Sequence, residues 1–178
     1  MQAARVSLLI VLLVTLSGCT VIGEIQSKVL LRQANKLMER DTDVTQKWSD
    51  EFLEVFTPTN RAQFPANRDF LRTHARQITK LLDESSSLNR LAADKYEQAA
   101  RLLSRDQRRR GLTSIASALR KSAEVNEIFK SLVQIVFDET VVEPKIFNQK
   151  FLDTAQQVKL KRREMDQYTE EGKRLLSL

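Results

Sequence analysis

Few residues of this chain have the types and spacing that catalysis or metal binding requires. The 178-residue sequence contains one cysteine, Cys19, and one histidine, His74. A di-iron helical bundle would need paired Glu-x-x-His motifs, and the residue three places before His74 is Leu71. The sequence has no HExxH, CxxC or CxxCH motif, no glycine-rich phosphate loop and no G-x-S-x-G motif. We therefore expect no metal, no cofactor and no enzymatic activity.

Cys19 ends a short apolar segment near the start of the chain. Arg5 precedes this segment, and residues 6–16 are nearly all aliphatic. A run of about eleven apolar residues is shorter than the roughly 20 that span a bilayer, and it is typical of a signal peptide. Residues 16–19 read Leu-Ser-Gly-Cys. This order resembles the lipobox of bacterial lipoproteins, and the resemblance covers residues 1–20 only.

The resemblance implies that residues 1–18 are removed and that Cys19 carries a diacylglyceryl thioether, usually with an N-acyl chain such as palmitate. In Gram-negative bacteria an Asp after the cysteine favours the inner membrane, so Thr20 favours the outer membrane. We expect a lipid-anchored protein of the bacterial cell envelope that faces the periplasm. Residues 19–23 would form a short tether. The alternative is an ordinary cleaved signal peptide with an incidental cysteine.

The remaining sequence, residues 24–178, has the length and composition of a single domain. The chain has 29 Lys+Arg against 23 Asp+Glu, a formal net charge of +6. This modest excess favours anionic lipid or glycan, and nucleic acid is a poor candidate partner in the periplasm.

Apolar residues recur at helical spacing, and no stretch alternates as a strand requires. The pattern predicts an all-α fold, an elongated up-down bundle of helices with narrow, coiled-coil-like apolar stripes. Five helices result if residues 41–43 or residues 85–87 break one of them. We predict four helices, at about 24–56, 67–110, 113–138 and 144–176.

Two groups of residues are candidate contact sites. The arginines before Gly111 are typical of the basic last turn of a helix, so they predict the end of the second helix. Gly111 would then be its left-handed capping residue. Up-down topology brings these arginines to the membrane end, where they are candidates for contact with anionic headgroups; they are Arg105, Arg108, Arg109 and Arg110. Trp48 and Phe64 fall near the opposite end, either in a core plug or in an exposed partner site.

Polar residues interrupt the apolar seams at Asn89 and Asn126, whereas the small residues Ser85, Ala92 and Ala99 suggest close helix approach rather than a cavity. A polar seam residue sets helix register at some cost in stability, so Asn126→Leu would raise thermal stability.

The sequence supports a structural or adaptor lipoprotein that acts through contacts with an envelope protein. The alternative is a binding module for a small apolar ligand or lipid in a cleft between helices. A dry core without a pocket would favour the first function. A deep apolar cleft near Tyr96, Phe129 or Phe151 would favour the second.

Overall fold

The computed structural model describes the backbone of residues 2–55, 57, 59–60, 63, 66–135 and 144–177. Side chains are described from residue 22 onward within these ranges, except at residues 144 and 147. Four long helices make up this part of the chain, and they are α1 (Gln2–Val55), α3 (Arg68–Arg101), α4 (Asp106–Gln134) and α5 (Pro144–Leu176).

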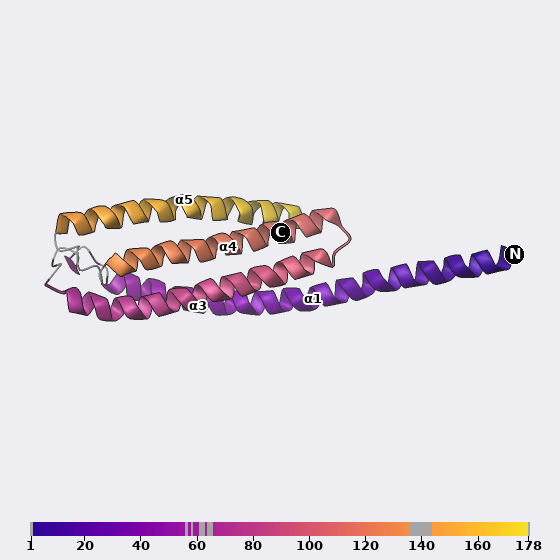
Figure 1. Ribbon diagram of the computed structural model, residues 1–178, viewed down its shortest axis with the longest axis horizontal. Helices are drawn as coiled ribbons and strands as arrows, with labels where there is room; N and C mark the ends of the chain where they lie inside the picture. Colours follow the sequence, from indigo (N-terminus) through magenta and orange to yellow (C-terminus); the bar gives the residue numbers. More distant parts are fainter. Residues whose placement is uncertain are drawn as a thin grey trace.

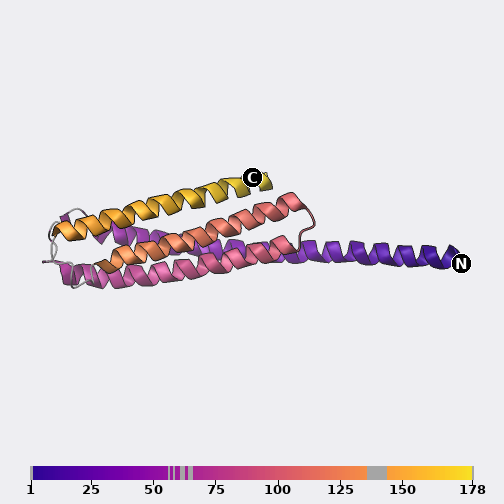
Figure 2. The same cartoon turned by 45° about the horizontal axis from the view of Figure 1, so that its top comes forward.

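The predicted all-α bundle of four helices is confirmed. The helices run up and down beside one another and form an elongated molecule (Figure 1). The turn between α3 and α4 lies at the end from which α1 extends beyond the other helices (Figures 1 and 2). We call this the near end, and the end where α1 finishes the far end. Residues 41–43 and 85–87 lie inside unbroken helices, so they do not create a fifth.

The boundary predicted at Gly111 is wrong. Helix α3 ends at Arg101, α4 begins at Asp106, and Gly111 lies in the second turn of α4. No described glycine has a positive φ, so Gly111 is not a left-handed capping residue. The connection is closed instead by the Leu102 amide, which donates to the Ala99 carbonyl. Asp106 in the first turn of α4 is favourable because the N-terminus of a helix carries a partial positive charge.

Gly111 and Gly172 allow α4 and α5 to approach closely. A Cβ atom at Gly111 would lie 2.8 Å from Leu176 Cγ, and one at Gly172 would lie 2.6 Å from Ile115 Cδ1. Real Cβ atoms do not approach other atoms so closely, so any larger residue must displace a neighbour. The two glycines therefore fix the spacing of these helices at the near end.

Substitution of Gly172 by valine is expected to lower the free energy of unfolding by about 1–3 kcal/mol, because the branched side chain overfills this helix contact. Urea denaturation followed by circular dichroism measures the change. The matched control is Lys173→Val, an exposed position on the same turn, which should change stability by about 0.5 kcal/mol or less. Equal stability of the two variants would contradict the close approach.

The core changes in character along the bundle. At the far end it contains large side chains, among them Trp48, Ile78 and Leu82. In the middle and at the near end it is built mainly on alanines, including Ala92, Ala116 and Ala99. Small residues bring helix backbones close together, so α3 and α4 pack tightly here without bulky side chains. The larger apolar residues of the near end lie around this alanine contact.

Candidate binding groove

One side of the bundle, between α1 and α5, is open. Packing along the helices joins α1 to α3, α3 to α4 and α4 to α5, whereas α1 and α5 share little contact over the described residues. The rings of Phe52 and Phe151 stack at a centroid distance of 6.5 Å and bridge the two helices toward the far end. Figure 2 shows α5 above α4 with α1 behind them. We call the space between α1 and α5 the α1–α5 groove, and it contains two hollows.

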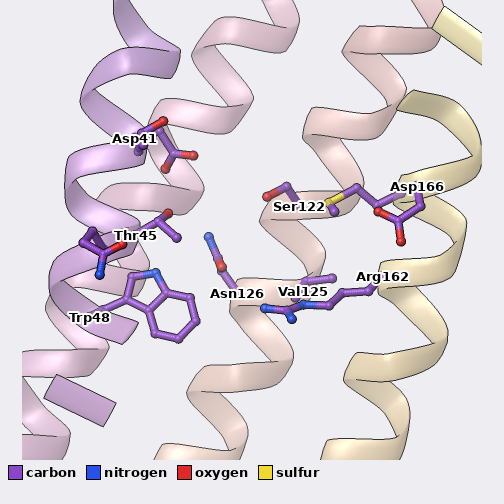
Figure 3. Close-up of a pocket in the computed structure, with 11 residues that line it drawn as sticks. Asp41, Thr45, Trp48, Ser122, Val125, Asn126, Arg162 and Asp166 are labelled. Atoms are coloured by element: carbon purple, nitrogen blue, oxygen red, sulfur yellow. The ribbon is translucent and has the colours of Figure 1, made fainter. Parts of the chain in front are cut away.

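The central hollow has a volume of about 460 Å³. Its walls come from α1, α4 and α5, and the indole of Trp48, the amide of Asn126 and the guanidinium of Arg162 lie toward one another within it (Figure 3). The apolar residues Val125 and Met165 also line the hollow, and the remaining lining residues are polar: Asp41, Thr42, Thr45, Gln46, Ser122 and Asp166. Such a mixture of donors and acceptors suits a polar ligand or a peptide segment better than a hydrocarbon.

A buried hydrogen-bond network forms the floor of the central hollow. Ser85 Oγ donates to Asp41 Oδ1 at 2.6 Å, and Asn89 Nδ2 donates to Asp41 Oδ2 at 2.9 Å. Asn126 Nδ2 donates to Ser85 Oγ at 2.8 Å, so the network joins α1, α3 and α4. Asn126→Leu would remove this donor from a buried network, which opposes the stabilisation expected from the sequence.

Burial raises the pKa of the Asp41 carboxyl, and the hydrogen bonds from Ser85 and Asn89 offset part of that effect. Asp41 is only 7% exposed, and the two groups that donate hydrogen bonds to its carboxyl are neutral. A buried carboxyl with a raised pKa beside a hollow is a common feature of functional sites.

Asp41→Asn is expected to raise the melting temperature at pH 7 relative to the unaltered protein. A carboxyl whose pKa is raised in the folded state binds more protons when folded, so stability falls as pH rises from the unfolded pKa through the folded pKa. The amide removes this loss and still accepts a hydrogen bond from Asn89. The advantage of the variant should therefore shrink as pH falls through the folded-state pKa toward about 4, and should stay constant at lower pH.

Thermal unfolding of both proteins across a pH series measures the difference. Asp43→Asn, at an exposed position on the same helix, is the matched control and should leave the pH profile unchanged. A variant less stable than the unaltered protein at pH 7 would show that the ionised carboxylate is required by the network.

Of the two alternatives considered for Trp48, a core plug and an exposed partner site, the structure shows the core. Trp48 is 5% exposed, and its ring lies 5.1 Å from that of Phe129, so the indole belongs to the core. Its Nε1–H group is buried at the central hollow without a hydrogen-bond partner. Phe64, the other candidate, lies outside the described residues.

The second hollow, the near-end cleft, has a volume of about 510 Å³. It lies beside Tyr96, whose hydroxyl donates to Asn35 Oδ1 at 2.8 Å. Burial raises the pKa of Tyr96. Its lining is mainly apolar, from Leu31, Leu103, Leu112, Ile115 and Leu176. Charged residues also line the cleft, and they are Glu24, Lys28 and Arg108.

The arginine cluster lies at the near end, but at the start of α4 and not at the end of α3. Arg105 directly precedes α4, and Arg108, Arg109 and Arg110 follow within its first turns, all exposed. Arg109 Nη2 donates to Asp106 Oδ1 at 2.6 Å. Because cations are favoured at helix C-termini, the helix dipole does not explain this cluster.

Asn89 and Asn126 stand out in the sequence as polar seam residues, and the structure joins them to Ser85 and Asp41 at the central hollow. For the near-end cleft, the sequence pointed only to Tyr96. Ser27 has no such signal, because a serine on an amphipathic helix is unremarkable in sequence. Its hydroxyl is buried at the cleft without a partner.

The predicted anchor, Cys19, and the preceding leader lie outside the described side chains. Their backbone belongs to α1, so residues 19–23 are helical where a tether was expected. Among the residues with described side chains, no helical segment has the length and apolarity to cross a bilayer. The same residues contain no cluster of three or more His, Cys, Asp or Glu side chains suited to a metal ion.

Comparison with known proteins gives no relative: no protein family, no curated protein and no solved structure matches the chain.

Proposed function

We propose that this chain is a lipid-anchored protein of the bacterial envelope that binds an apolar ligand or lipid between its helices. The near-end cleft carries the proposal, because it is an apolar space of about 510 Å³ beside Tyr96. Ligand sites in proteins commonly have volumes of about 300–1,000 Å³ and mainly apolar walls with a few polar groups. The lipobox-like residues 16–19 support attachment through Cys19, with the protein facing the periplasm from the outer membrane.

Binding is tested with a fluorescent apolar probe, N-phenyl-1-naphthylamine. The protein is the mature chain with Cys19→Ala, exported with an ordinary cleaved leader so that no membrane competes for the probe. We expect saturable binding at one site per chain. Leu103→Trp, which places a large ring in the cleft, should abolish it. Leu91→Trp is the matched control, since Leu91 is 48% exposed on α3 and does not line the cleft.

Circular dichroism establishes that both variants fold. Absence of saturable binding in the unaltered cleft would overturn the proposed function. Equal binding by Leu103→Trp and Leu91→Trp would also overturn it, because the probe would then bind elsewhere.

A structural or adaptor role is the second candidate function, and the central hollow favours it. An unpaired buried N–H costs about 1–3 kcal/mol, so a carbonyl from a partner protein reaching Trp48 Nε1 would be stabilising. Arg162 and Asp166 line the same hollow and offer charged contacts. In this role the partner is an envelope protein, and the arginines at the start of α4 contact anionic headgroups.

The adaptor role is tested by a photoreactive residue at Gln46, beside the central hollow, in the lipidated protein in its native envelope. We expect a discrete crosslink to one protein that Trp48→Phe weakens. The control position is Gln98, which is exposed on α3. Identical crosslinks from both positions would contradict the role.

A further inference from the structure

We propose that the near-end cleft binds a single-chain anionic amphiphile, with the acyl chain among the leucines and the acidic head at Lys28 and Arg108. Fatty acids and lysophospholipids have this chemistry. The inference deepens the proposed function and rests on it, because that function requires only an apolar ligand. It adds a head group of defined charge and a direction for the chain.

The walls of the cleft suit a flexible hydrocarbon. Leu103, Leu112 and Ile115 come from the α3–α4 connection and α4, and Leu31 and Leu176 come from α1 and α5. Removal of apolar surface from water is favourable in proportion to the area buried, so an acyl chain in contact with several leucines gains binding free energy. The central hollow, where most lining residues are polar, offers less apolar surface.

Two exposed cations are among the residues that line this cleft. Lys28 lies on α1 and Arg108 on α4, and both line the space. Glu24 lines it as well, one helical turn before Lys28, so the charged lining has two cations and one carboxylate. A guanidinium forms paired hydrogen bonds with a carboxylate or phosphate, and an ammonium adds a point charge.

Ser27 supplies an independent indication of a ligand. The residue is 1% exposed, lines the cleft, and its Oγ has no hydrogen-bond partner. A buried hydroxyl without a partner is unfavourable, because it has lost its hydrogen bonds to water. Because Ser27 adjoins Lys28, a head group held by Lys28 and Arg108 could accept a hydrogen bond from this hydroxyl. Ligand binding would then recover part of that cost.

The position of the cleft gives a lipid a short path to it. A Cβ atom at Gly23 would lie 3.0 Å from the Leu102 carbonyl oxygen, so α1 meets the α3–α4 connection at Gly23. At a helical rise of about 1.5 Å per residue, Gly23 is about 6 Å and Lys28 about 14 Å along the helix from Cys19. With Cys19 in the membrane, the charged lining lies close to the headgroup layer, which is about 5–8 Å thick.

The test compares palmitate with hexadecanol as competitors of N-phenyl-1-naphthylamine on the soluble Cys19→Ala chain. The two molecules share a chain length and differ in the charge of the head. We expect the double variant Lys28→Glu/Arg108→Glu to weaken palmitate at least about tenfold and to change hexadecanol by no more than about twofold. Arg163→Glu, an exposed charge reversal away from the cleft, is the matched control.

Equal affinities of palmitate for the double variant and the control would overturn the inference while leaving apolar binding, and thus the proposed function, intact. Absence of probe binding by the unaltered Cys19→Ala chain would instead overturn both. Both reversed residues are exposed, so the fold does not depend on them, and circular dichroism verifies this.

A second comparison tests whether the acyl chain in the cleft belongs to a free amphiphile or to the lipid on Cys19. Radiolabelled palmitate is added to the soluble Cys19→Ala chain and to the lipidated protein in nanodiscs. Binding to the double variant, measured in each of the two forms, is subtracted as nonspecific background. Equal specific binding shows that the cleft takes a free amphiphile. Binding by the Cys19→Ala chain alone would contradict the inference for the anchored protein, because its cleft would then be closed to a free anionic amphiphile. Absence of specific binding from both forms would contradict the inference.

Discussion

Replacement of Cys19 by alanine, in a chain exported with an ordinary cleaved leader, is expected to move the protein from the membrane fraction to the soluble fraction. A single acyl chain binds a bilayer only marginally, with an association constant of about 10⁴ M⁻¹, whereas two or three chains give stable attachment. Each buried methylene contributes about 0.8 kcal/mol, so loss of the lipid removes nearly all membrane affinity. Fractionation with immunoblotting measures the distribution.

Ser17→Ala in the native leader is the matched control for this prediction. Alanine keeps a small residue two places before the cysteine, so lipidation and membrane attachment should be unchanged. Intact mass spectrometry of the native protein supplies a direct measurement of the lipid on Cys19. A free thiol at Cys19, or a leader still attached, would contradict the anchoring, as would membrane retention of the alanine variant after a high-salt wash.

Trp48→Ala is expected to lower the free energy of unfolding by about 3–5 kcal/mol, the usual cost of removing a large buried aromatic side chain. The Trp48 indole packs against Phe129 at 5.1 Å and belongs to the far-end core with Ile78 and Leu82. In a domain of this size about 1 kcal/mol shifts the melting temperature by about 2–4 °C. Thermal unfolding should therefore move downward by at least about 6 °C.

Two controls separate packing from hydrogen bonding at Trp48. Trp48→Phe keeps a ring and removes an N–H group that has no partner in the structure, so its effect on stability should be much smaller. Leu53→Ala removes apolar atoms from the same helix at a position 69% exposed and should cost about 0.5 kcal/mol or less. Similar losses in Trp48→Ala and Leu53→Ala would contradict the burial of the indole.

The number and type of helices could be predicted from sequence because apolar periodicity reports directly on which face of a helix is buried. The start of α5 at Pro144 agrees with the predicted boundary, since proline suits a first helical position. The α3–α4 boundary was missed because Gly111 has two uses, capping and close approach. Sequence does not distinguish them, and the contact with Leu176 shows that the second applies.

The sites were less predictable than the fold. Asn89 and Asn126 could be recognised as polar residues in apolar seams, but not their partners, Asp41 for Asn89 and Ser85 for Asn126, because a single helix pattern does not specify which helices meet. For the same reason the sequence named Tyr96 as a possible neighbour of a cleft without specifying the other walls. An apolar stripe shows that Leu31 or Leu112 is covered, and it does not show whether a neighbouring helix or a hollow lies beside it.

The open side of the bundle also affects which helices can unfold locally. Helix α3 is held between α1 and α4, whereas α5 rests almost entirely on α4. Proteins open in cooperative segments, and segments with fewer contacts open at lower free energy. Release of an outer helix, α1 from α3 or α5 from α4, is therefore less costly than release of α3 or α4, which each pack against two helices. After release of α5, the exposed face of α4 would accept the α5 of a second molecule, a route to domain-swapped dimers.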